Sequence, residues 1–190
     1  MALSQQIIKA LKLINEFKIL YVFPAKNKKT TSESLWNLLH PRSIFSWKWD
    51  ETADPKVVRL WWLKDELARS QKALYGRFFS NQPCFVSLDH AMKNKWGDQN
   101  SDDFEGNNDS LEKAILDSLA SNSPQTKRML KKIIQVDIEA HTKYEWNKAF
   151  EKLQRKKLIC NLGDSERENS FMPSTEYGFI PTIFESQVGT

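Results

Sequence analysis

The side chains that could carry acid–base chemistry do not have the spacing of a known catalytic motif. Asp50 and Glu51 form the closest carboxylate pair, but they stand just before a predicted helix start, where acidic groups favour the helix dipole. Asp89 and His90 are neighbours in sequence, which does not make a catalytic dyad. The sequence contains no GxSxG, GxxxxGKS/T, GxGxxG or HExxH pattern. These carboxylates therefore favour local electrostatics over catalysis.

The residues that could bind a metal are equally scattered. His40, His90 and His141 lie far apart, and each fits a structural or exposed role better than ligation. Cys84 and Cys160 lack CxxC spacing and are predicted to be reduced, partly buried thiols, as is typical of a cytosolic protein. We therefore expect no metal, no cofactor and a cytoplasmic location.

The composition describes a folded chain with a mild preference for polyanions. Forty per cent of the 190 residues are hydrophobic, and seven Trp and eleven Phe exclude a disordered chain. A net charge of +4 is weak for a nucleic-acid binder. No apolar stretch approaches the roughly 18 residues that span a bilayer, and the start does not resemble a signal peptide, so we expect no membrane partner.

The charge divides the chain into three parts. Residues 1–96 have an excess of basic side chains, whereas residues 97–109, "GDQNSDDFEGNND", contain acids and no base. Residues 110–190 are close to neutral. The acidic segment has the Gly, Asn, Ser and Asp content of a solvated linker. The sequence thus predicts an N-terminal domain over 1–96, a linker over 97–109 and a C-terminal domain over 110–190.

The C-terminal part reads as three helices followed by a hairpin, which is the order of a winged helix. Ser110 can cap the first helix, Ser123 and Pro124 can begin the second, and Thr142 with Glu145 has the spacing of a capping box on the third. The apolar face of the third helix comprises Trp146, Ala149, Phe150 and Leu153. "LICNLG" and "TEYGFIPTIF" are predicted to be its two strands, joined by a loop.

The N-terminal part is predicted to be mostly helical. Ser4 can cap a first helix, "SESLWNLLHP" gives a short one, and Asp54 with Pro55 begins a long one. "IFSWKWDE" alternates like a strand, and "LYGRFFSNQPCFVS" resembles a hairpin followed by a helix over "LDHAMKNKW". The expected fold is mainly α with small β-hairpins, an α+β class with a tandem winged-helix-like architecture.

Basic side chains on the outer face of the third C-terminal helix are the candidate nucleic-acid contacts. In a winged helix this helix usually enters the major groove. The candidates there and in the N-terminal loop, which also holds Lys26, are Lys28, Lys29, Lys143, Tyr144, Asn147, Lys148, Arg155 and Lys157. Lysine and arginine can neutralise phosphates, and Asn147 could read a base edge. The alternative is a solvated helix face, because Glu145 and Glu151 dilute its charge and the wing carries Asp164, Glu166 and Glu168.

The aromatic side chains allow two interpretations. Trp47 and Trp49 beside Lys48 could stack an unpaired base, but Phe45 and the two tryptophans on one strand face more often form a core layer, and the core is favoured. On the long helix, Val58 and Trp62 lie away from the core face. This second apolar side predicts a surface for self-association or a protein partner.

Three stretches carry a resemblance to a known family: "KILYVFPAKNKKTTSESLWNLL", the segment from "FSWKWDE" to "SLDHA", and "EWNKAFEKLQRKKLI". From about residue 18 the chain resembles the AlkZ-type crosslink-repair DNA glycosylases and the shorter AlkZ-related proteins, which are built from winged-helix modules. The resemblance implies DNA as partner, with RNA as an alternative.

The resemblance also implies that the catalytic motif is replaced. In the active enzymes a Gln, an apolar residue and an Asp or Gln precede a proline, and the two polar side chains position water and stabilise the sugar cation. Tyr21 and Phe23, before Pro24, occupy the matching positions here. A phenol with a pKa near 10 is a poor general base at neutral pH, and phenylalanine has no proton to transfer.

Three functional hypotheses follow. The first is a non-catalytic, winged-helix DNA-binding protein, with DNA or RNA backbone as its partner. The second is a divergent DNA glycosylase that uses other residues. The third is a protein interaction or assembly module that acts through the surface around Trp62.

Overall fold

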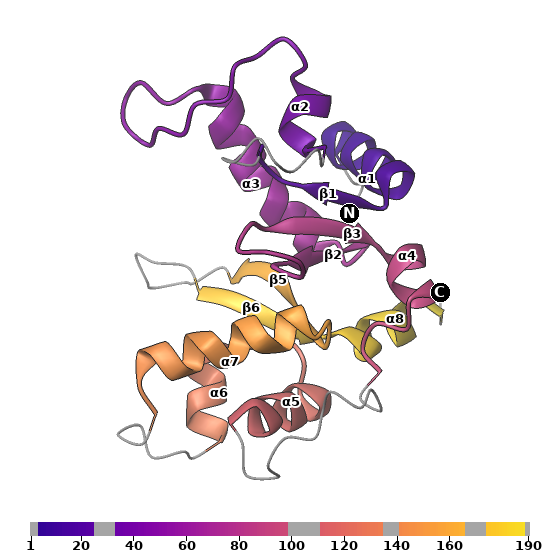
Figure 1. Cartoon of the computed structure of the whole chain (residues 1–190), viewed down its shortest axis with the longest axis vertical. Coiled ribbons are helices and arrows are strands. Elements are labelled where there is room, and N and C mark those ends of the chain that lie inside the picture. Colours follow the sequence, from indigo (N-terminus) through magenta and orange to yellow (C-terminus); the bar gives the residue numbers. More distant parts are fainter. Residues whose placement is uncertain (1–3, 25–32, 99–110, 135–140, 166–173, 189–190) are drawn as a thin grey trace.

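The computed structural model describes residues 4–24, 33–98, 111–134, 141–165 and 174–188, and one order of elements occurs twice in it (Figure 1). The N-terminal half contains α1 (Gln5–Phe17), β1 (Ile19–Tyr21), α2 (Leu35–Leu39), α3 (Pro55–Arg69), β2 (Ala73–Gly76) and β3 (Cys84–Ser87). The C-terminal half contains α5 (Leu111–Ser121), β4 (Gln125–Thr126), α6 (Lys127–Ile133), α7 (Lys143–Arg155), β5 (Ile159–Ser165) and β6 (Ser174–Phe179). The additional helices α4 (Leu88–Lys93) and α8 (Ile180–Val188) follow the two halves. The predicted α+β fold with two winged-helix units is confirmed.

The strands of both halves join in one antiparallel sheet. Within each half the first strand pairs with the third and the third with the second, so β3 lies between β1 and β2, and β6 lies between β4 and β5. Tyr75 of β2 pairs with Asn161 of β5, which gives the order β1-β3-β2-β5-β6-β4. In Figure 1 the sheet runs through the middle of an elongated molecule, with one group of helices at each end. The two winged-helix units therefore meet along β2 and β5.

Gly97 and Asp98 are the only described residues of the predicted acidic linker. The amide of Gly97 donates to the carbonyl of Lys157 at 2.9 Å, which ties the start of this segment to the end of α7. The rest of the segment lies outside the described residues. The division into two domains with a linker over 97–109 remains a prediction.

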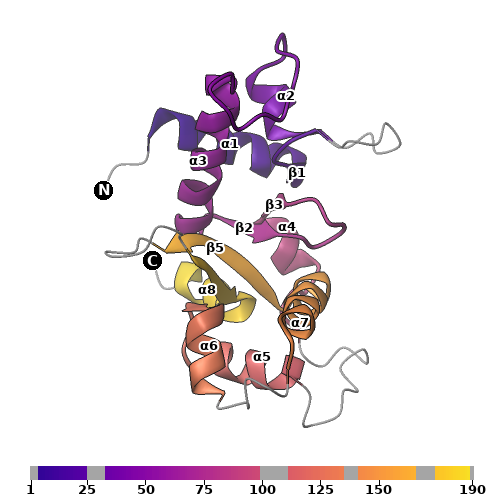
Figure 2. The same cartoon turned by 90° about the vertical axis from the view of Figure 1, so that its left-hand side faces the viewer.

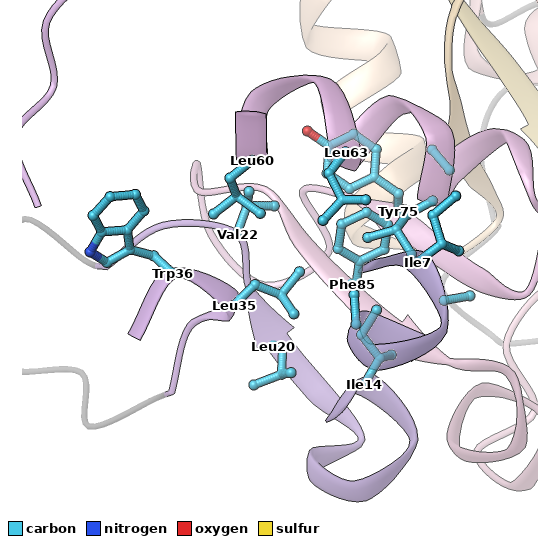
Figure 3. Packing of buried hydrophobic residues seen from close by; sticks show 14 of the residues in the cluster. Ile7, Ile14, Leu20, Val22, Leu35, Trp36, Leu60, Leu63, Tyr75 and Phe85 are labelled. Carbon is cyan, nitrogen blue, oxygen red and sulfur yellow. The ribbon is translucent and has the colours of Figure 1, made fainter. Parts of the chain in front are cut away.

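Three apolar clusters hold the molecule together. In the first, side chains from α1, β1 and α2 pack against Leu60 and Leu63 of α3, and the ring of Tyr75 stacks on Phe85 at 4.8 Å (Figure 3). The second lies around α5, α6 and α7. The third contains side chains of both halves, including Leu74 of β2 and Leu162 of β5. This third cluster fixes the two halves to each other through side-chain packing as well as through the sheet.

The predicted caps of α1, α3 and α7 are confirmed, whereas the predicted cap Ser110 lies outside the described residues. Thr142 Oγ1 accepts from the Glu145 amide at 3.3 Å, and Glu145 Oε2 accepts from the Thr142 amide at 2.6 Å, so the capping box is complete. Asp54 accepts from the Lys56 amide at 2.8 Å at the start of α3, and Ser4 caps α1. These caps satisfy backbone donors that have no partner within the helix.

Two boundaries in the C-terminal half differ from the prediction. Ser123 and Pro124 do not begin a helix, because the next two residues pair with β6 as β4, and Thr126 caps α6 instead. The returning strand ends at Phe179, and α8 follows at once. Ile180 and Ile183, three residues apart, are both buried in the third cluster, so packing favours the helical period over the strand period there.

The predicted aromatic strand over "IFSWKWDE" is wrong. Residues 43–49 have no regular secondary structure. Trp47 is 43% exposed and Trp49 is 49% exposed, so the interpretation of these tryptophans as a core layer is also wrong. They pack edge-on against each other, with ring centroids 5.6 Å apart, and both contact Trp61 of α3.

Cys84 and Cys160 are free and buried, and burial raises the pKa of each thiol to about 12. Both stay protonated at neutral pH, which makes them unreactive packing groups. Within the described ranges, the helices are too short or too polar to cross a membrane.

Candidate nucleic-acid interface

Side chains of α6 and α7 line a basic groove at one end of the molecule (Figure 1). The two helices lie on different sides of the C-terminal half (Figure 2). The groove has a volume of about 540 Å³. The side chains that line it are Lys127, Arg128, Lys131, Lys132, Lys143, Trp146, Asn147 and Ser174. Five of these are cationic, and none of the described lining residues is acidic. We call this site the α6–α7 groove.

The spacing of the basic residues on α6 explains how the groove forms. Lys127 and Lys131 are four residues apart, as are Arg128 and Lys132, so all four lie on neighbouring rows of the same helix surface. Leu130 is fully buried and holds the other surface of α6 in the second cluster. Packing of α6 by Leu130 therefore turns its cations toward α7.

Lys127 is the best-fixed cation of the groove. Its Nζ donates to Asn147 Oδ1 at 2.8 Å and lies 4.7 Å from the ring centroid of Phe150. Burial lowers the pKa of Lys127, the charges of Arg77, Lys131 and Lys143 lower it further, and Glu151 opposes the change. Several cations therefore repel one another here, and a bound anion would relieve that repulsion.

Lys131 is also held in place by an aromatic ring. Its Nζ lies 5.3 Å from the ring centroid of Trp146, which is buried in α7. A cation within about 6 Å of an aromatic face is attracted by the ring quadrupole. The ring thus orders the ammonium without neutralising its charge.

The predicted contact residues fall into separate places. Lys143 and Asn147 line the groove, whereas Tyr144 and Lys148 are exposed on α7 beside it. Arg155 donates to Asn81 Oδ1 at 2.8 Å at the far end of α7, about 18 Å along the helix from Lys143 at 1.5 Å per residue. The structure therefore does not bring the predicted set into one site.

The remaining predicted lysines are Lys157, Lys28 and Lys29. Lys157 Nζ lies 5.3 Å from the ring centroid of Trp96 and 5.7 Å from that of Phe79, so aromatic contacts hold it. Lys28 and Lys29, like Lys26, lie outside the described residues.

Sequence reasoning missed the four cations of α6. The pattern "KRMLKK" places two pairs of basic residues one turn apart, and this spacing was the available signal. The third helix of the unit drew attention because it is the usual recognition helix. The second helix supplies most of the positive charge here.

A second cavity lies where the two halves meet, and we call it the central cleft. Its volume is about 580 Å³. It is lined by Phe23, Pro24, Phe45, Trp47, Trp61, Lys64, Asp65, Tyr75, Arg77, Asn81, Gln82, Pro83, Asn161, Gly163, Asp164 and Thr175. Aromatic side chains of the N-terminal half thus face polar groups of β5 and β6.

The central cleft contains a nearly buried ion pair. Lys64 Nζ lies 2.6 Å from Asp65 Oδ1, and the two side chains are 6% and 4% exposed. Burial raises the pKa of Asp65, although the hydrogen bond and charge of Lys64 oppose this, and the nearby charge of Asp164 raises it further. Asp164 itself accepts a hydrogen bond from Thr175 at 2.8 Å.

Phe23 and Tyr21, which the resemblance places at the family's catalytic positions, lie in different surroundings. Phe23 lines the central cleft and stacks on Phe45 with ring centroids 5.2 Å apart. Tyr21 is buried in the third apolar cluster, at 8% exposure. Neither side chain brings a carboxylate or an amide to the cleft.

The carboxylate pair of Asp50 and Glu51 does not line the cleft. Hydrogen bonds from the hydroxyl and the amide of Thr52 lower the pKa of Asp50, and they close a turn just before α3. This arrangement agrees with the local role that the sequence favoured. Within the described part of the chain, no three His, Cys, Asp or Glu side chains are grouped so that they could hold a metal ion.

The surface around Trp62 is open to solvent. Trp62 is 58% exposed on α3, and Val58, one turn before it, is half-buried. The structure contains one chain, so a protein partner at this surface stays a prediction.

A family model described as AlkZ related matches residues 5–188. The curated proteins contain no match to this chain.

Proposed function

The chain belongs to the AlkZ-related family, which is related to DNA-repair glycosylases, and we propose that it binds duplex DNA through the α6–α7 groove without excising bases. The observation that carries the proposal is the grouping of five cations around one groove with no acid among the described lining residues. Lysine and arginine at such positions bind phosphates and supply most of the affinity for duplex DNA.

The position of the groove in the winged-helix unit supports this proposal. α7 is the third helix of its unit and presents Lys143, Tyr144 and Lys148 to solvent beside the groove. The third helix of a winged helix is the one that usually enters the major groove. With α7 there, α6 would lie next to the phosphate backbone, where its four basic side chains can neutralise charge.

Asn147 is unsuited to reading bases, because one of its side-chain groups is already hydrogen-bonded. Its Oδ1 already accepts from Lys127, which leaves the amide hydrogens of the side chain as the groups that it offers to DNA. Reading of adenine by asparagine needs both the donor and the acceptor. We therefore assign Asn147 to the positioning of Lys127 and expect weak sequence preference.

The absence of base excision rests on the residues at the motif positions. Water activation needs a side chain that can take a proton near neutral pH. Tyr21 is buried among apolar groups and Phe23 is stacked on Phe45, so neither can position water over a sugar. Excision through the family's polar pair is therefore not expected.

Salt-dependent binding tests the proposal directly. Each phosphate contact releases counterions, so the logarithm of the affinity for duplex DNA should fall linearly with the logarithm of salt concentration, with a slope of about −0.9 per contact. Lys131→Ala/Lys132→Ala removes two cations of the groove, so the magnitude of that slope should decrease by about 1.8. The matched control is Lys12→Ala/Lys72→Ala, which removes the same charge from exposed lysines outside the groove. A flat plot, or equal effects of both variants, contradicts the proposal.

A second candidate function is a divergent glycosylase that uses the carboxyl groups of the central cleft. Asp65 has a raised pKa and Asp164 faces the same cavity, and two carboxyl groups in different environments are what glycoside cleavage requires. An abasic-site assay on alkylated duplexes decides between the candidates. Base release that disappears in Asp164→Asn, with duplex binding unchanged, would establish this second function.

A further inference from the structure

We propose that the central cleft holds one unstacked nucleobase of a bound nucleic-acid strand, with Trp47 as its stacking platform. This inference rests on the proposed function, because DNA in the α6–α7 groove brings the strand to the cleft. It adds a second type of contact, one that recognises an unpaired base. The ligand chemistry is a purine or pyrimidine ring with N–H donors on its edge.

The aromatic wall of the cleft is both exposed and rigid. Trp47 is 43% exposed, although its ring meets Phe23 at 5.0 Å, Trp61 at 5.5 Å and Trp49 at 5.6 Å, all edge-on. Phe45 also contacts the Trp47 ring, with ring centroids 6.0 Å apart, and together these contacts fix the orientation of the indole. The exposed part of Trp47 lines the cleft, where a flat ligand can contact it.

Polar side chains of the same cleft offer hydrogen-bonding groups that match a base edge. Asp164 and Asn161 of β5 line the cleft, and Asp65 lines it from α3. Among the described residues, Asn161 Oδ1 has no hydrogen-bond partner although it is shielded from solvent. An unpaired buried acceptor is costly. The exocyclic amine of adenine, cytosine or guanine is a donor that suits these acceptor groups.

The size of the cleft fits a base better than a duplex. Its volume of about 580 Å³ lies within the roughly 300–1,000 Å³ of small-ligand sites. Side chains of both halves close it on two sides, whereas the α6–α7 groove is bordered only by the C-terminal half.

The cleft and the groove are neighbours. Arg77 lines the cleft, and its charge is among the causes that lower the pKa of Lys127 in the groove. Ser174 lines the groove, and the next residue of β6, Thr175, lines the cleft. A strand whose phosphates lie on Lys127 and Arg77 would therefore place an adjacent nucleotide at the cleft.

The deciding experiment compares a base with its absence at one position. Hairpin duplexes would carry a single bulged adenine, or a bulged abasic sugar at the same place, beside a fully paired duplex. We expect the bulged adenine to bind roughly tenfold more tightly than the abasic bulge, as one base–aromatic stack predicts. Trp47→Leu should remove this preference, and Trp47→Phe should keep most of it. Trp62→Ala is the control, because Trp62 is exposed outside the cleft.

The outcomes separate this inference from the proposed function. Equal affinities for the adenine and abasic bulges overturn the inference, while tight binding of the paired duplex still supports the function. If no duplex binds, the proposed function fails, and a single-stranded oligonucleotide with and without one base then tests the cleft. Free adenosine monophosphate serves as competitor: half-saturation at the same concentration as the bulged duplex would show a free nucleotide as ligand and overturn the strand-bound base.

Discussion

Lys64 and Asp65 are consecutive residues of α3 whose side chains turn toward each other and form an ion pair with an Nζ–Oδ1 distance of 2.6 Å. Both side chains are almost excluded from water. The ammonium also lies 4.1 Å from the ring centroid of Trp61. The removal of two charges from water is costly, and their attraction does not always repay it. The pair lies in the wall of the central cleft, where it holds a charged, oriented surface.

Removal of one member of this pair should destabilise the protein strongly. Asp65→Leu leaves the Lys64 ammonium buried without a counter-charge, and we expect a loss of about 3–5 kcal/mol in the free energy of unfolding. Lys64→Met should cost a similar amount. The double variant Lys64→Met/Asp65→Leu should lie within about 1 kcal/mol of the unmodified protein or above it. Urea unfolding with an unchanged m value provides the measurement.

The pH dependence of the Lys64→Met variant checks the same pair. Burial raises the pKa of the Asp65 carboxyl group, so the folded protein binds this proton more tightly than the unfolded chain does. The resulting stabilisation is fully present below the unfolded pKa of about 3.9 and is lost as the pH rises through the folded pKa. The hydrogen bond and the charge of Lys64 lower the pKa of Asp65, so Lys64→Met should raise that pKa further. Stability should therefore fall more steeply above pH 4 in Lys64→Met than in the unmodified protein. An identical pH profile would mean that the pair is solvated.

Lys127 should make DNA binding sensitive to alkaline pH. Burial and the neighbouring cations lower its pKa, so Lys127 loses its proton at a lower pH than an ordinary lysine. The affinity for duplex DNA should therefore decrease in the alkaline range, below the pH of about 10.4 at which ordinary lysines lose their charge. Lys127→Arg keeps its charge over this range. Fluorescence anisotropy at fixed salt should show a flatter pH profile for Lys127→Arg than for the unmodified protein, and parallel profiles would exclude Lys127 from the interface.

Much of the fold could be predicted from local signals. The capping residues Ser4, Asp54 and Thr142 mark their helices because a cap bonds to an amide two or three positions away. The hairpin of β2 and β3 could be predicted from two short apolar runs joined by a polar turn. The order of helices and strands predicted the winged helix. The joining of the two sheets could not be predicted, because the Tyr75–Asn161 pairing connects residues that are far apart in sequence and carries no local pattern.

The sites were harder to predict than the fold. Trp47 and Trp49 have the alternation of a strand, but contacts with Trp61 hold them in an irregular segment. The α6–α7 groove depends on how Leu130 turns one helix toward another, and a sequence does not display that rotation. Asp65 and Asp164 line the same cleft only because the two winged-helix units share a sheet. The residues that face a cavity are fixed by long-range packing.

The capping box of α7 should contribute measurably to stability. Thr142→Ala removes the hydroxyl that accepts from the Glu145 amide, and the loss of such a cap costs about 1 kcal/mol. α7 carries Lys143 and Asn147, so fraying of its first turn should also weaken DNA binding, by a few-fold. Thr142→Ser keeps the hydroxyl and is the matched control. Thermal unfolding should place Thr142→Ser close to the unmodified protein and Thr142→Ala several degrees below it.

Gly163 should tolerate no side chain, because it combines a left-handed backbone with close packing. Its φ is +89°, and an added Cβ would lie 3.0 Å from the carbonyl oxygen of Asp65 and 3.2 Å from Cγ of Arg69. Alanine at such a position is strained by about 1–3 kcal/mol, and relief requires α3 to move away from β5. Gly163→Ala should therefore lower the unfolding free energy by at least about 1 kcal/mol and widen the central cleft. If the cleft holds a base, the preference for a bulged adenine should decrease together with stability, whereas the affinity for a fully paired duplex should persist.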